Sequence, residues 1–500
     1  MNAHEGVFLA PEVWRTALGL ASGERLPAQW PEQLHGVTPD SRQVRPGVIF
    51  HAVQGTHMDG HAYLDEAVRR GATGLVVEKA PGHPMKAPHV VVPDSRAALA
   101  RLACAFHGNP AAELNLVGVT GTNGKTTVAA FVRQLLEGLG LRCGMLGTVS
   151  YAFGSREIPA RRTTPGAPEL HGLLRAMRDA DCTECVMEIS SHALDQRRVE
   201  GLEVDTAVFT NLSQDHLDYH LDMESYFRAK ARLFAFPSVK TRIVGEDLWS
   251  RRLSKTYGES VWACGLNADC AIRAEALHCN RDGTRAQLIT PWGAGELILN
   301  IPGHHNVRNA LQAIAVVAAR GIPLSSILPL VPGLKAAPGR LESIPSTLGR
   351  VVVDYAHTPD ALGNILTTLR PLTKGRLIVV FGCGGDRDRG KRAPMAAHAA
   401  AHGDFLILTQ DNPRTEDSHR IFTDMLAGIP SKTMLEVIPD RAAAIRRGVD
   451  MLGPDDLLLI AGKGHEATQE FANSKVPFDD REVARKCLRR RDLCPAGGPT

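Results

Sequence analysis

A glycine-rich segment at residues 121–127 has the composition of a phosphate-binding loop. Gly121-Thr122-Asn123-Gly124-Lys125-Thr126-Thr127 follows an apolar run and precedes an amphipathic one, VAAFVRQLLEGL. In such a loop the backbone N–H groups at the start of the helix hold phosphate oxygens, Lys125 reaches the terminal phosphates and the Thr126 hydroxyl ligates Mg²⁺. The strict GxxxxGK[ST] spacing fails, because Val119 stands at its first glycine. A turn with an incidental lysine is the alternative, but the order of strand, loop and helix favours an ATP site.

Three further side chains could work beside a phosphate-bound metal. Glu188 lies near the end of the apolar run CVMEIS, where a lone carboxylate is costly, so its partner is either a metal or an arginine. His216, in SQDHLDYH, is a weaker metal candidate, because an isolated histidine is more often structural. Lys230, in MESYFRAKARLF, has apolar residues one helical turn before and after it. Either its stem covers apolar surface, or its desolvated amine is a nucleophile or captures CO₂ as a carbamate.

Arginine, asparagine and acidic residues gather in three segments of the C-terminal third. The segments are GCGGDR (382–387), DNPR (411–414) and GKGHE (462–466). Arg387 and Arg414 each offer a planar fork that matches a carboxylate or phosphate, and Asn412 adds a donor and an acceptor. Glu466 adds a carboxylate that could bind an amine. The segments therefore predict a small substrate with both charge types, such as an amino acid, with surface ion pairs over turns as the alternative.

Short apolar runs rich in β-branched residues precede most of these polar clusters. Such runs alternate with helix-like stretches, which is typical of βαβ units and a parallel sheet. Ligands of open α/β sheets bind at the carboxyl ends of the strands, where the polar clusters fall. The predicted strands are Leu116–Thr120, Glu184–Ile189, Thr206–Thr210, Arg350–Asp354, Arg376–Phe381, Asp404–Thr409 and Asp456–Ile460.

The length of the chain and its proline- and glycine-containing breaks predict three domains. A chain of 500 residues has room for about three, Asn109-Pro110 ends a first segment, and the stretch 332–339 is typical of a linker. We therefore predict an α/β protein with three domains. They are a small mixed α/β N-terminal domain (1–110), a central phosphate-loop ATPase-like parallel-sheet domain (111–336) and a C-terminal Rossmann-like domain (337–500).

Composition excludes several classes of protein. With 22% charged residues, 44% apolar residues and a net charge of +3, the chain is typical of a globular protein and has no global field that would recruit nucleic acid or membrane. No apolar run approaches the ~18 residues of a spanning helix, so we expect a cytoplasmic protein without membrane insertion. Cys182 and Cys185 have no second CxxC to complete a zinc site, and packing is the favoured role.

Taken together, the motifs resemble those of the Mur ligases. The resemblance runs from Asp40 to the GKGHE segment, and GTNGKTT is that family's own form of the phosphate loop. Among relatives, DNPR discriminates most, because those that add L-lysine usually carry another tetrapeptide there. The further family motifs are Thr163-Thr164-Pro165, Ser190-Ser191-His192, Gln196-Arg197-Arg198, AKARLF around Lys230, HHNVRN, PGRLE, DYAHTPDAL and GCGGDRDRGKR.

The resemblance implies an ATP-dependent ligase of cytoplasmic peptidoglycan precursor synthesis, a pathway of cell wall biogenesis, cell shape and cell division. ATP would phosphorylate the D-glutamyl γ-carboxylate of UDP-MurNAc-L-Ala-D-Glu, and the amine of meso-2,6-diaminopimelate would attack the acyl phosphate. These small molecules, ATP and Mg²⁺ would be the partners, without nucleic acid, and we expect a monomer. Lys230 would be the family's carbamylated lysine, a negatively charged group that helps to place Mg²⁺.

The resemblance also implies a ligand for each group of residues. The UDP-substrate would contact Ser41, Thr56, His57, Met58, Thr163, Thr164, Ser190, Gln196 and Arg198. ATP would contact the loop 121–127, Asn306, Asn309, Arg340 and Asp354. Diaminopimelate would contact Arg387, Asp411, Asn412, Pro413, Arg414, Gly462 and Glu466. The catalytic residues would be Lys125, Lys230, Glu188 and His216, and the metal ligands Thr126, Glu188 and His216.

Two rival functions stay open on sequence grounds. Folylpolyglutamate synthase also joins an amino acid to a γ-carboxylate, but it would not need DNPR or the N-terminal nucleotide motifs. A phosphate-loop ATPase acting on nucleic acid would bind RNA or DNA in a salt-sensitive way and turn over ATP without an amino acid. The balanced charge argues against the second rival.

Overall fold

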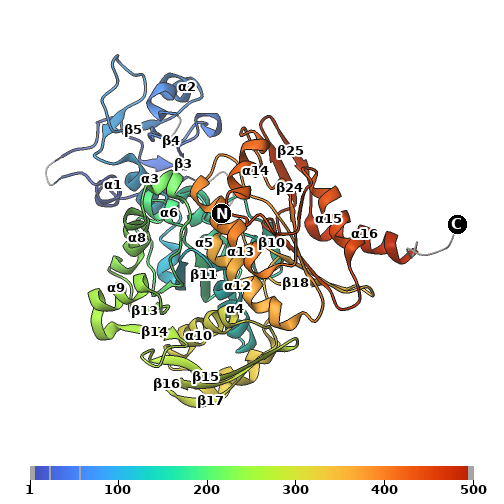
Figure 1. Ribbon diagram of the computed structural model, residues 1–500. Helices are drawn as coiled ribbons and strands as arrows, with labels where there is room; N and C mark the ends of the chain where they lie inside the picture. Colours follow the sequence, from blue (N-terminus) through green and yellow to red (C-terminus); the bar gives the residue numbers. More distant parts are fainter. Residues whose placement is uncertain (1–5, 22–23, 56–57, 494–500) are drawn as a thin grey trace. The chain divides into compact units, whose positions relative to one another are not determined.

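The computed structural model describes residues 6–21, 24–55 and 58–493 (Figure 1). The chain forms two compact units. The first unit holds Met1–Thr120, Gly140–Ala207 and Ala229–Thr241, and the second holds Gly121–Leu139, Val208–Arg228 and Arg242–Thr500. The chain passes between them after Thr120, after Leu139, and within β12 (Thr206–Phe209), α8 (Met223–Ala231) and β13 (Thr241–Val244). Thr56 and His57, two expected UDP-substrate contacts, lie outside the described residues.

The N-terminal part of the first unit is a parallel sheet of four strands with helices on both faces. Its strands, in spatial order, are β3 (Gly36–Thr38), β4 (Val48–His51), β5 (Gly74–Val77) and β6 (His89–Val91), and its helices are α1 (Pro11–Leu18), α2 (Leu64–Arg69) and α3 (Ser95–Phe106). Successive strand residues point to opposite faces, so Ile49 and Val76 join the core under α1 and α3, while Phe50 and Leu75 join the core under α2. A short antiparallel pair joins β1 (Val7–Phe8) to β2 (Gln33–Leu34).

Five strands of the first unit belong to the central part of the chain. In spatial order they are β10 (Arg156–Pro159), β9 (Ser150–Phe153), β8 (Cys143–Leu146), β11 (Glu184–Glu188) and β7 (Asn115–Thr120), accompanied by α5 (Ala167–Asp179) and α6 (Ser191–Asp195). The strands β8, β11 and β7 are parallel. All residues of β11 are buried, as expected for a strand covered on both faces. This burial places the terminal Glu188 at an enclosed carboxyl end of the sheet.

The second unit opens with the phosphate loop and α4 (Lys125–Gly138), which packs against α10 (His304–Ala318). Almost every residue of α10 is buried, because its sequence is apolar nearly all round. The neighbouring elements of this part are α7 (Leu217–His220), α9 (Leu248–Tyr257), β14 (Val261–Gly265), β15 (Ile272–Asn280), β16 (Gly283–Thr290), β17 (Gly293–Leu299) and α11 (Leu324–Ile327).

The C-terminal part of the second unit is a six-stranded sheet between two layers of helices. The strands, in spatial order, are β18 (Glu342–Ile344), β19 (Arg350–Asp354), β23 (Leu457–Ala461), β20 (Leu377–Phe381), β21 (Phe405–Leu408) and β22 (Leu435–Val437). All are parallel except β18. The helices are α12 (Pro359–Leu369), α13 (Arg392–His402), α14 (Ser418–Leu426), α15 (Arg441–Met451) and α16 (Asp480–Leu493), and a separate hairpin joins β24 (Thr468–Phe471) to β25 (Ser474–Pro477).

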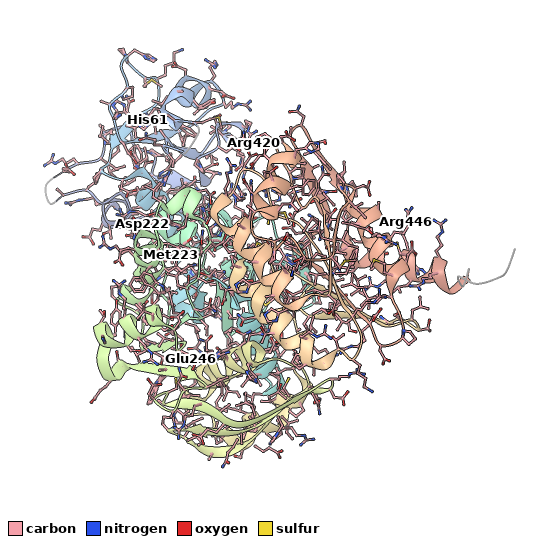
Figure 2. All side chains as sticks on the ribbon, in the orientation of Figure 1. His61, Asp222, Met223, Glu246, Arg420 and Arg446 are labelled. Carbon is pink, nitrogen blue, oxygen red and sulfur yellow. The ribbon has the colours of Figure 1, made fainter. Side chains whose placement is uncertain are left out.

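Alternation along the strands explains the two helical layers of this sheet. Val352 and Val379 pack under α12, α13 and α14, whereas Val351 and Ile378 pack under α15 and α16. Figure 1 shows α12 and α13 on one side of the strands and α15 and α16 on the other. Arg446 of α15 is exposed and projects away from the sheet (Figure 2). The loops at the carboxyl ends of the strands are therefore left open for a site.

The predicted α/β fold with parallel sheets is confirmed. Every predicted strand is present, and no strand end differs from its prediction by more than one residue. The domain limits near residues 110 and 336 stay predictions. Within the described part of the chain, no helix combines the length and the apolar character needed to cross a bilayer.

One buried histidine makes the stability of the first unit depend on pH. His171 of α5 is fully buried, and neither ring nitrogen has a partner among the described residues. Burial, helped by the nearby His107, lowers the pKa of His171 from its ordinary 6.5 to about 3. Above pH 6.5 the His171 ring is neutral in both the folded and the unfolded chain. Between pH 6.5 and 3 only the unfolded chain binds a proton there, so the free energy of unfolding decreases as the pH falls toward 3.

We therefore expect His171→Leu to remove about 2 kcal/mol of the stability loss between pH 7 and pH 5. The measurement is the opening free energy of α5 amides by hydrogen exchange at both pH values. His83→Leu, at an exposed histidine of the same unit, serves as the control and should keep the wild-type slope. An unchanged slope in His171→Leu would mean that His171 does not drive this loss.

Candidate active site

The phosphate loop needs glycine at two positions for backbone and steric reasons. Gly121 and Gly124 have φ angles of 140° and 85°, a backbone conformation that residues with a side chain rarely adopt. A Cβ on Gly121 would lie 1.9 Å from Thr210 Oγ1, and one on Gly124 would lie 2.5 Å from Asn309 Oδ1. The loop is therefore pressed against the segment after β12 and against α10.

Hydrogen bonds hold this loop in shape at the start of α4. Lys125 Nζ donates to the carbonyl oxygens of Gly121 and Thr122 at 2.9 and 2.8 Å. Thr210 Oγ1 donates to the Asn123 carbonyl at 2.6 Å, and Asn123 N donates to Asn211 Oδ1 at 3.1 Å. The ammonium of Lys125 thus lies over the loop, beside the N–H groups that begin a helix of 14 residues.

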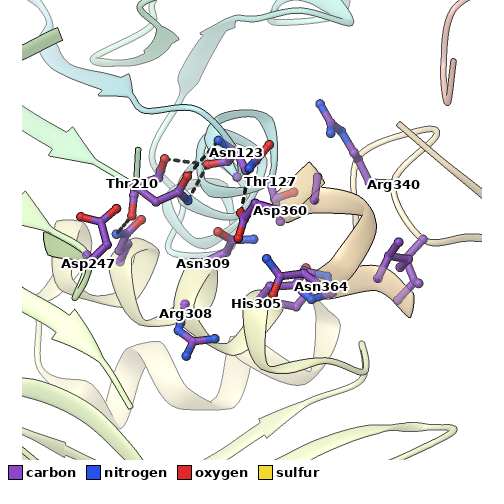
Figure 3. Close-up of a pocket in the computed structure, with 18 of the residues that line it drawn as sticks. Asn123, Thr127, Thr210, Asp247, His305, Arg308, Asn309, Arg340, Asp360 and Asn364 are labelled. Carbon is purple, nitrogen blue, oxygen red and sulfur yellow. Dashed lines mark hydrogen bonds between the residues drawn. The ribbon is translucent and has the colours of Figure 1, made fainter. Parts of the chain in front are cut away.

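A cavity of about 330 Å³ opens beside the loop and joins residues far apart in the sequence (Figure 3). Of the residues expected at ATP, the cavity is lined by Asn123, Gly124, Thr127, Asn306, Asn309, Arg340 and Asp354. The remaining four, Gly121, Thr122, Lys125 and Thr126, belong to the same loop. Neither the DNPR segment nor Arg387 contributes to its lining.

The PGRLE and DYAHTPD segments reach the phosphate loop directly. Arg340 Nη2 donates to Thr126 Oγ1 at 3.4 Å, and its guanidinium lies 4.4 Å from the centroid of the Tyr355 ring. Asp354 accepts backbone N–H bonds from Leu341 at 2.7 Å and from Ala356 at 2.8 Å. Burial raises the pKa of Asp354, although Arg340 opposes that shift. This wall of the cavity therefore offers one cation and one enclosed carboxyl group.

Several cavity residues were missed by sequence reasoning. Glu246, after β13, pairs with Arg308 and accepts N–H bonds from Leu266 and Asn267 at 2.7 and 2.9 Å (Figure 2). Burial alone would raise the pKa of Glu246, but Arg308 and the N–H bonds from Leu266 and Asn267 together outweigh burial, and the net shift is downward. Asp360 accepts from Asn123 Nδ2 at 3.0 Å, as Figure 3 shows. Arg308 stands inside HHNVRN and could have been found there, whereas nothing near Glu246 in the sequence signals its role.

His216 lies beside a buried ion pair of the second unit. Its Nε2 is 3.4 Å from Asp215 Oδ2, and Lys391 Nζ donates to Asp215 Oδ1 at 3.1 Å. His357 Nε2 is 3.7 Å from the same carboxylate. Burial opposes ionisation of Asp215, but Lys391, then His216 and His357, hold its pKa well below the ordinary value. The NLSQDH segment is thereby tied to Lys391, which directly precedes α13.

The residues expected around the muramoyl peptide form one network in the first unit. Thr148 donates to Glu188 twice, from its backbone N at 2.8 Å and its hydroxyl at 3.0 Å. Thr164 Oγ1 donates to the Glu188 carbonyl at 2.9 Å and accepts from Ser190 N at 3.0 Å. Arg198 Nη1 donates to the Thr164 carbonyl at 3.1 Å. The other two members are Thr163, whose hydroxyl oxygen lies 3.1 Å from that of Thr148, and Gln196, which accepts from Arg198.

Three other candidates also lie in the first unit. Ser41 is buried and its hydroxyl donates to Glu66 Oε2 at 3.0 Å. Met58 is 66% exposed, with its sulfur accepting from the Tyr63 hydroxyl at 3.4 Å. Lys230 is 1% exposed, so its ammonium does not reach water. The alternative in which the stem covers apolar surface while the charge stays in solvent is therefore wrong.

The three C-terminal segments do converge. GCGGDR follows β20, DNPR follows β21 and GKGHE follows β23, which are neighbours in the order β23-β20-β21. A Cβ on Gly384 would lie 3.2 Å from Arg414 Nη1 and 3.7 Å from Arg387 Cγ, so the two arginines flank this glycine. Asn412 Nδ2 donates to Glu466 Oε2 at 3.0 Å.

Glu470 and the Gly385 carbonyl hold Arg414 in place. Its Nε donates to Glu470 Oε2 at 3.2 Å, and its Nη1 donates to the Gly385 carbonyl at 2.8 Å. Behind it, Asp411 and Pro413 are buried, and a Cβ on Gly462 would lie 2.7 Å from Asp411 Oδ2. The arrangement presents an oriented guanidinium next to an amide and a carboxylate, which suits a small amino acid.

Family comparisons match three segments of the chain. They are "Mur ligase family, catalytic domain" over residues 33–107, "Mur ligase middle domain" over 119–317 and "Mur ligase, glutamate ligase domain" over 339–464. A UDP-N-acetylmuramoyl-L-alanyl-D-glutamate--2,6-diaminopimelate ligase of Thermosynechococcus vestitus is 43% identical over 483 residues, covering 95% of this chain and 97% of the relative. The enzyme of that name from Geobacter sulfurreducens is 42% identical, covering 92% and 95%.

Solved structures agree with these matches. A structure titled UDP-N-acetylmuramoyl-L-alanyl-D-glutamate--2,6-diaminopimelate ligase aligns with a TM-score of 0.68 and 33% identity, covering 97% of this chain and all of the other. MurF from Acinetobacter baumannii shares the fold, with a TM-score of 0.65 at 20% identity over 98% and 99% of the two chains. Because the matches cover its three segments and nearly its whole length, this chain belongs to the Mur ligase family.

Proposed function

We propose that the chain adds meso-2,6-diaminopimelate to the D-glutamyl γ-carboxylate of UDP-MurNAc-L-Ala-D-Glu, using ATP and passing through an acyl phosphate. The observation that carries this proposal is the convergence of GCGGDR, DNPR and GKGHE on neighbouring strand ends of a chain that also holds a phosphate loop. Relatives that match more than nine tenths of this chain, at 95% and 92%, are named as ligases of UDP-N-acetylmuramoyl-L-alanyl-D-glutamate and 2,6-diaminopimelate. The proposal includes a cytoplasmic, monomeric enzyme that serves cell shape and division through peptidoglycan precursor supply.

Phosphoryl transfer is assigned to the phosphate loop and its cavity. Lys125 stabilises the charge of the transferring phosphoryl group, while the backbone N–H groups at the start of α4 hold the phosphate oxygens. Asn306 and Asn309 contact the adenine, and Arg340 and Asp354 contact the nucleotide from the opposite wall. The transfer turns an unreactive carboxylate into an acyl phosphate that an amine can attack.

Mg²⁺ fits the donors available here. Among the described residues no three His, Cys, Asp or Glu side chains converge into a closed metal site. Mg²⁺ normally binds through one or two carboxylates together with substrate phosphates and water, so an open set with a single carboxylate is appropriate. Thr126, Glu188 and His216 would be its protein ligands. When bound, the ion neutralises phosphate charge during transfer.

The two substrates to be joined are assigned to separate groups of residues. Ser41, Thr56, His57 and Met58 take the uridine nucleotide, and the Thr164 network takes the muramoyl peptide. Arg387, the DNPR segment, Gly462 and Glu466 take diaminopimelate. The distal carboxylate of diaminopimelate, which lysine lacks, pairs bidentately with Arg414.

ADP release by the purified protein tests the proposed reaction. We expect release with UDP-MurNAc-L-Ala-D-Glu and diaminopimelate together, and little when L-lysine replaces diaminopimelate. Turnover with neither amino acid, or equal turnover with both, would contradict the proposal. Release that requires a folate substrate would instead support the folylpolyglutamate synthase alternative.

A carbamate on Lys230 is a separate prediction. A fully buried ammonium is costly, and a desolvated neutral amine reacts with CO₂. We expect protein equilibrated with ¹³C-bicarbonate to show a carbamate resonance that Lys230→Met lacks. Lys240→Met, at a lysine with a 79% exposed side chain, is the control and should keep the resonance. A resonance that survives in Lys230→Met would assign the carbamate to another residue. The absence of a carbamate resonance in the wild type would contradict the prediction.

A further inference from the structure

Lys463 is a buried lysine between two of the side chains assigned to diaminopimelate. It is 0% exposed, and its Nζ donates to Asn412 Oδ1 and to Glu466 Oε2, each at 2.9 Å. Lys463 follows β23 and Asn412 follows β21, and β20 lies between these strands. The ammonium therefore links two strand ends across the end of a third.

This contact sets the direction of the Asn412 amide. Asn412 Oδ1 accepts from Lys463 Nζ and from Glu470 N, the latter at 3.0 Å, while Nδ2 donates to Glu466 Oε2. An ammonium can only donate, so it requires the oxygen of the amide on its own side. The Nδ2 group carries two hydrogens, and only one has an acceptor among the described residues. The second is left for a substrate carboxylate.

The same ammonium sets the direction of the Glu466 carboxylate. Oε2 accepts from both Lys463 and Asn412, and Oε1 is 3.5 Å from the Tyr355 hydroxyl. With Oε2 engaged twice, Oε1 is the oxygen with capacity to accept a substrate ammonium. A carboxylate without these donors could rotate, and an incoming amino acid would then have to order it.

A purely structural role explains Lys463 poorly. Burying an ion pair usually stabilises a fold no more than apolar packing does. The neighbouring buried pair, Arg441 with Asp480, illustrates a structural contact: Arg441 also donates to the Ala461 carbonyl and joins α15 to α16 and β23. Its partners include no residue assigned to a substrate, whereas both partners of Lys463 are so assigned.

We infer that Lys463 is a positioning residue, which orients the Asn412 amide and the Glu466 carboxylate to receive the incoming amino acid. The inference rests on the proposed function, because that function assigns both partners to diaminopimelate. It adds a residue that touches no substrate and acts only through these two side chains.

Steady-state kinetics of Lys463→Met test the inference, because methionine keeps the length and the apolar stem. We expect the KM for diaminopimelate to rise about 10- to 100-fold, the loss typical of hydrogen bonds to charged groups. The KM values for ATP and the UDP-substrate should change less than about twofold, and kcat should fall less than the KM rises. Lys463→Gln, whose amide keeps N–H donors but carries no charge, should recover part of the loss. Equal changes in all three KM values, or an unchanged KM for diaminopimelate, would overturn the inference.

A double-variant cycle keeps the test decisive if the single variant is unstable. If Lys463 acts through Asn412, Lys463→Gln should raise the amino acid KM much less in an Asn412→Ala background than in the wild type. Full additivity would refute the positioning role. The wild type is assayed first: if it uses another amino acid instead of diaminopimelate, the proposed substrate fails, and the inference is tested with the KM for that amino acid.

Discussion

Lys125→Met is expected to lower the rate of ADP release by about 10³-fold at saturating substrates. The ammonium of Lys125 lies over the phosphate loop, 2.9 and 2.8 Å from two of its carbonyl oxygens, at the start of α4. Methionine keeps the length of the side chain but removes the charge that stabilises the transferring phosphoryl group. The measurement is kcat with UDP-MurNAc-L-Ala-D-Glu, diaminopimelate and ATP.

Lys432→Met is the matched control, because Lys432 is an exposed lysine of the same unit. It should retain the wild-type rate. Thermal unfolding of both variants shows whether either has lost structure. A Lys125→Met rate within tenfold of the wild type in a folded protein would remove Lys125 from the catalytic machinery.

Arg414→Met is expected to lower the preference for diaminopimelate over L-lysine by at least about 10²-fold. A site built to pair with a carboxylate rejects an analogue without one by roughly 10⁴-fold, because N–H groups of the guanidinium are left without an acceptor. Glu470 and the Gly385 carbonyl orient this guanidinium before substrate arrives. Methionine removes both the attraction for diaminopimelate and the cost of binding lysine. The measurement is the ratio of kcat/KM for the two amino acids.

The control for this variant is Arg420→Met on α14, where Arg420 is exposed (Figure 2). It should keep the wild-type ratio. If Arg414→Met also kept the ratio while remaining folded, recognition of the second carboxylate would have to be assigned to another residue, with Arg387 the first to test.

Local patterns were enough to predict the strands and the loops that follow them. A buried parallel strand is a short run of β-branched and aliphatic residues, and that composition is present whether or not the chain is folded. The phosphate loop and DNPR were found for a similar reason, since their chemistry depends on residues adjacent in sequence. The pattern around Lys230 does not distinguish a solvent-reaching ammonium from a desolvated amine. Helical spacing shows which residues are near a lysine but not whether its ammonium reaches water.

The sequence by itself determined the α/β class, the strand positions and the residue types at the strand ends. Only the tertiary structure decided which of these ends meet. It joined Asn123 to Asp360, paired Glu246 with Arg308 and buried Lys463 between Asn412 and Glu466. Those contacts depend on strand order and on the packing of helices against the sheet. Both arise from burial summed over the whole chain, so the residues adjacent in sequence do not reveal them.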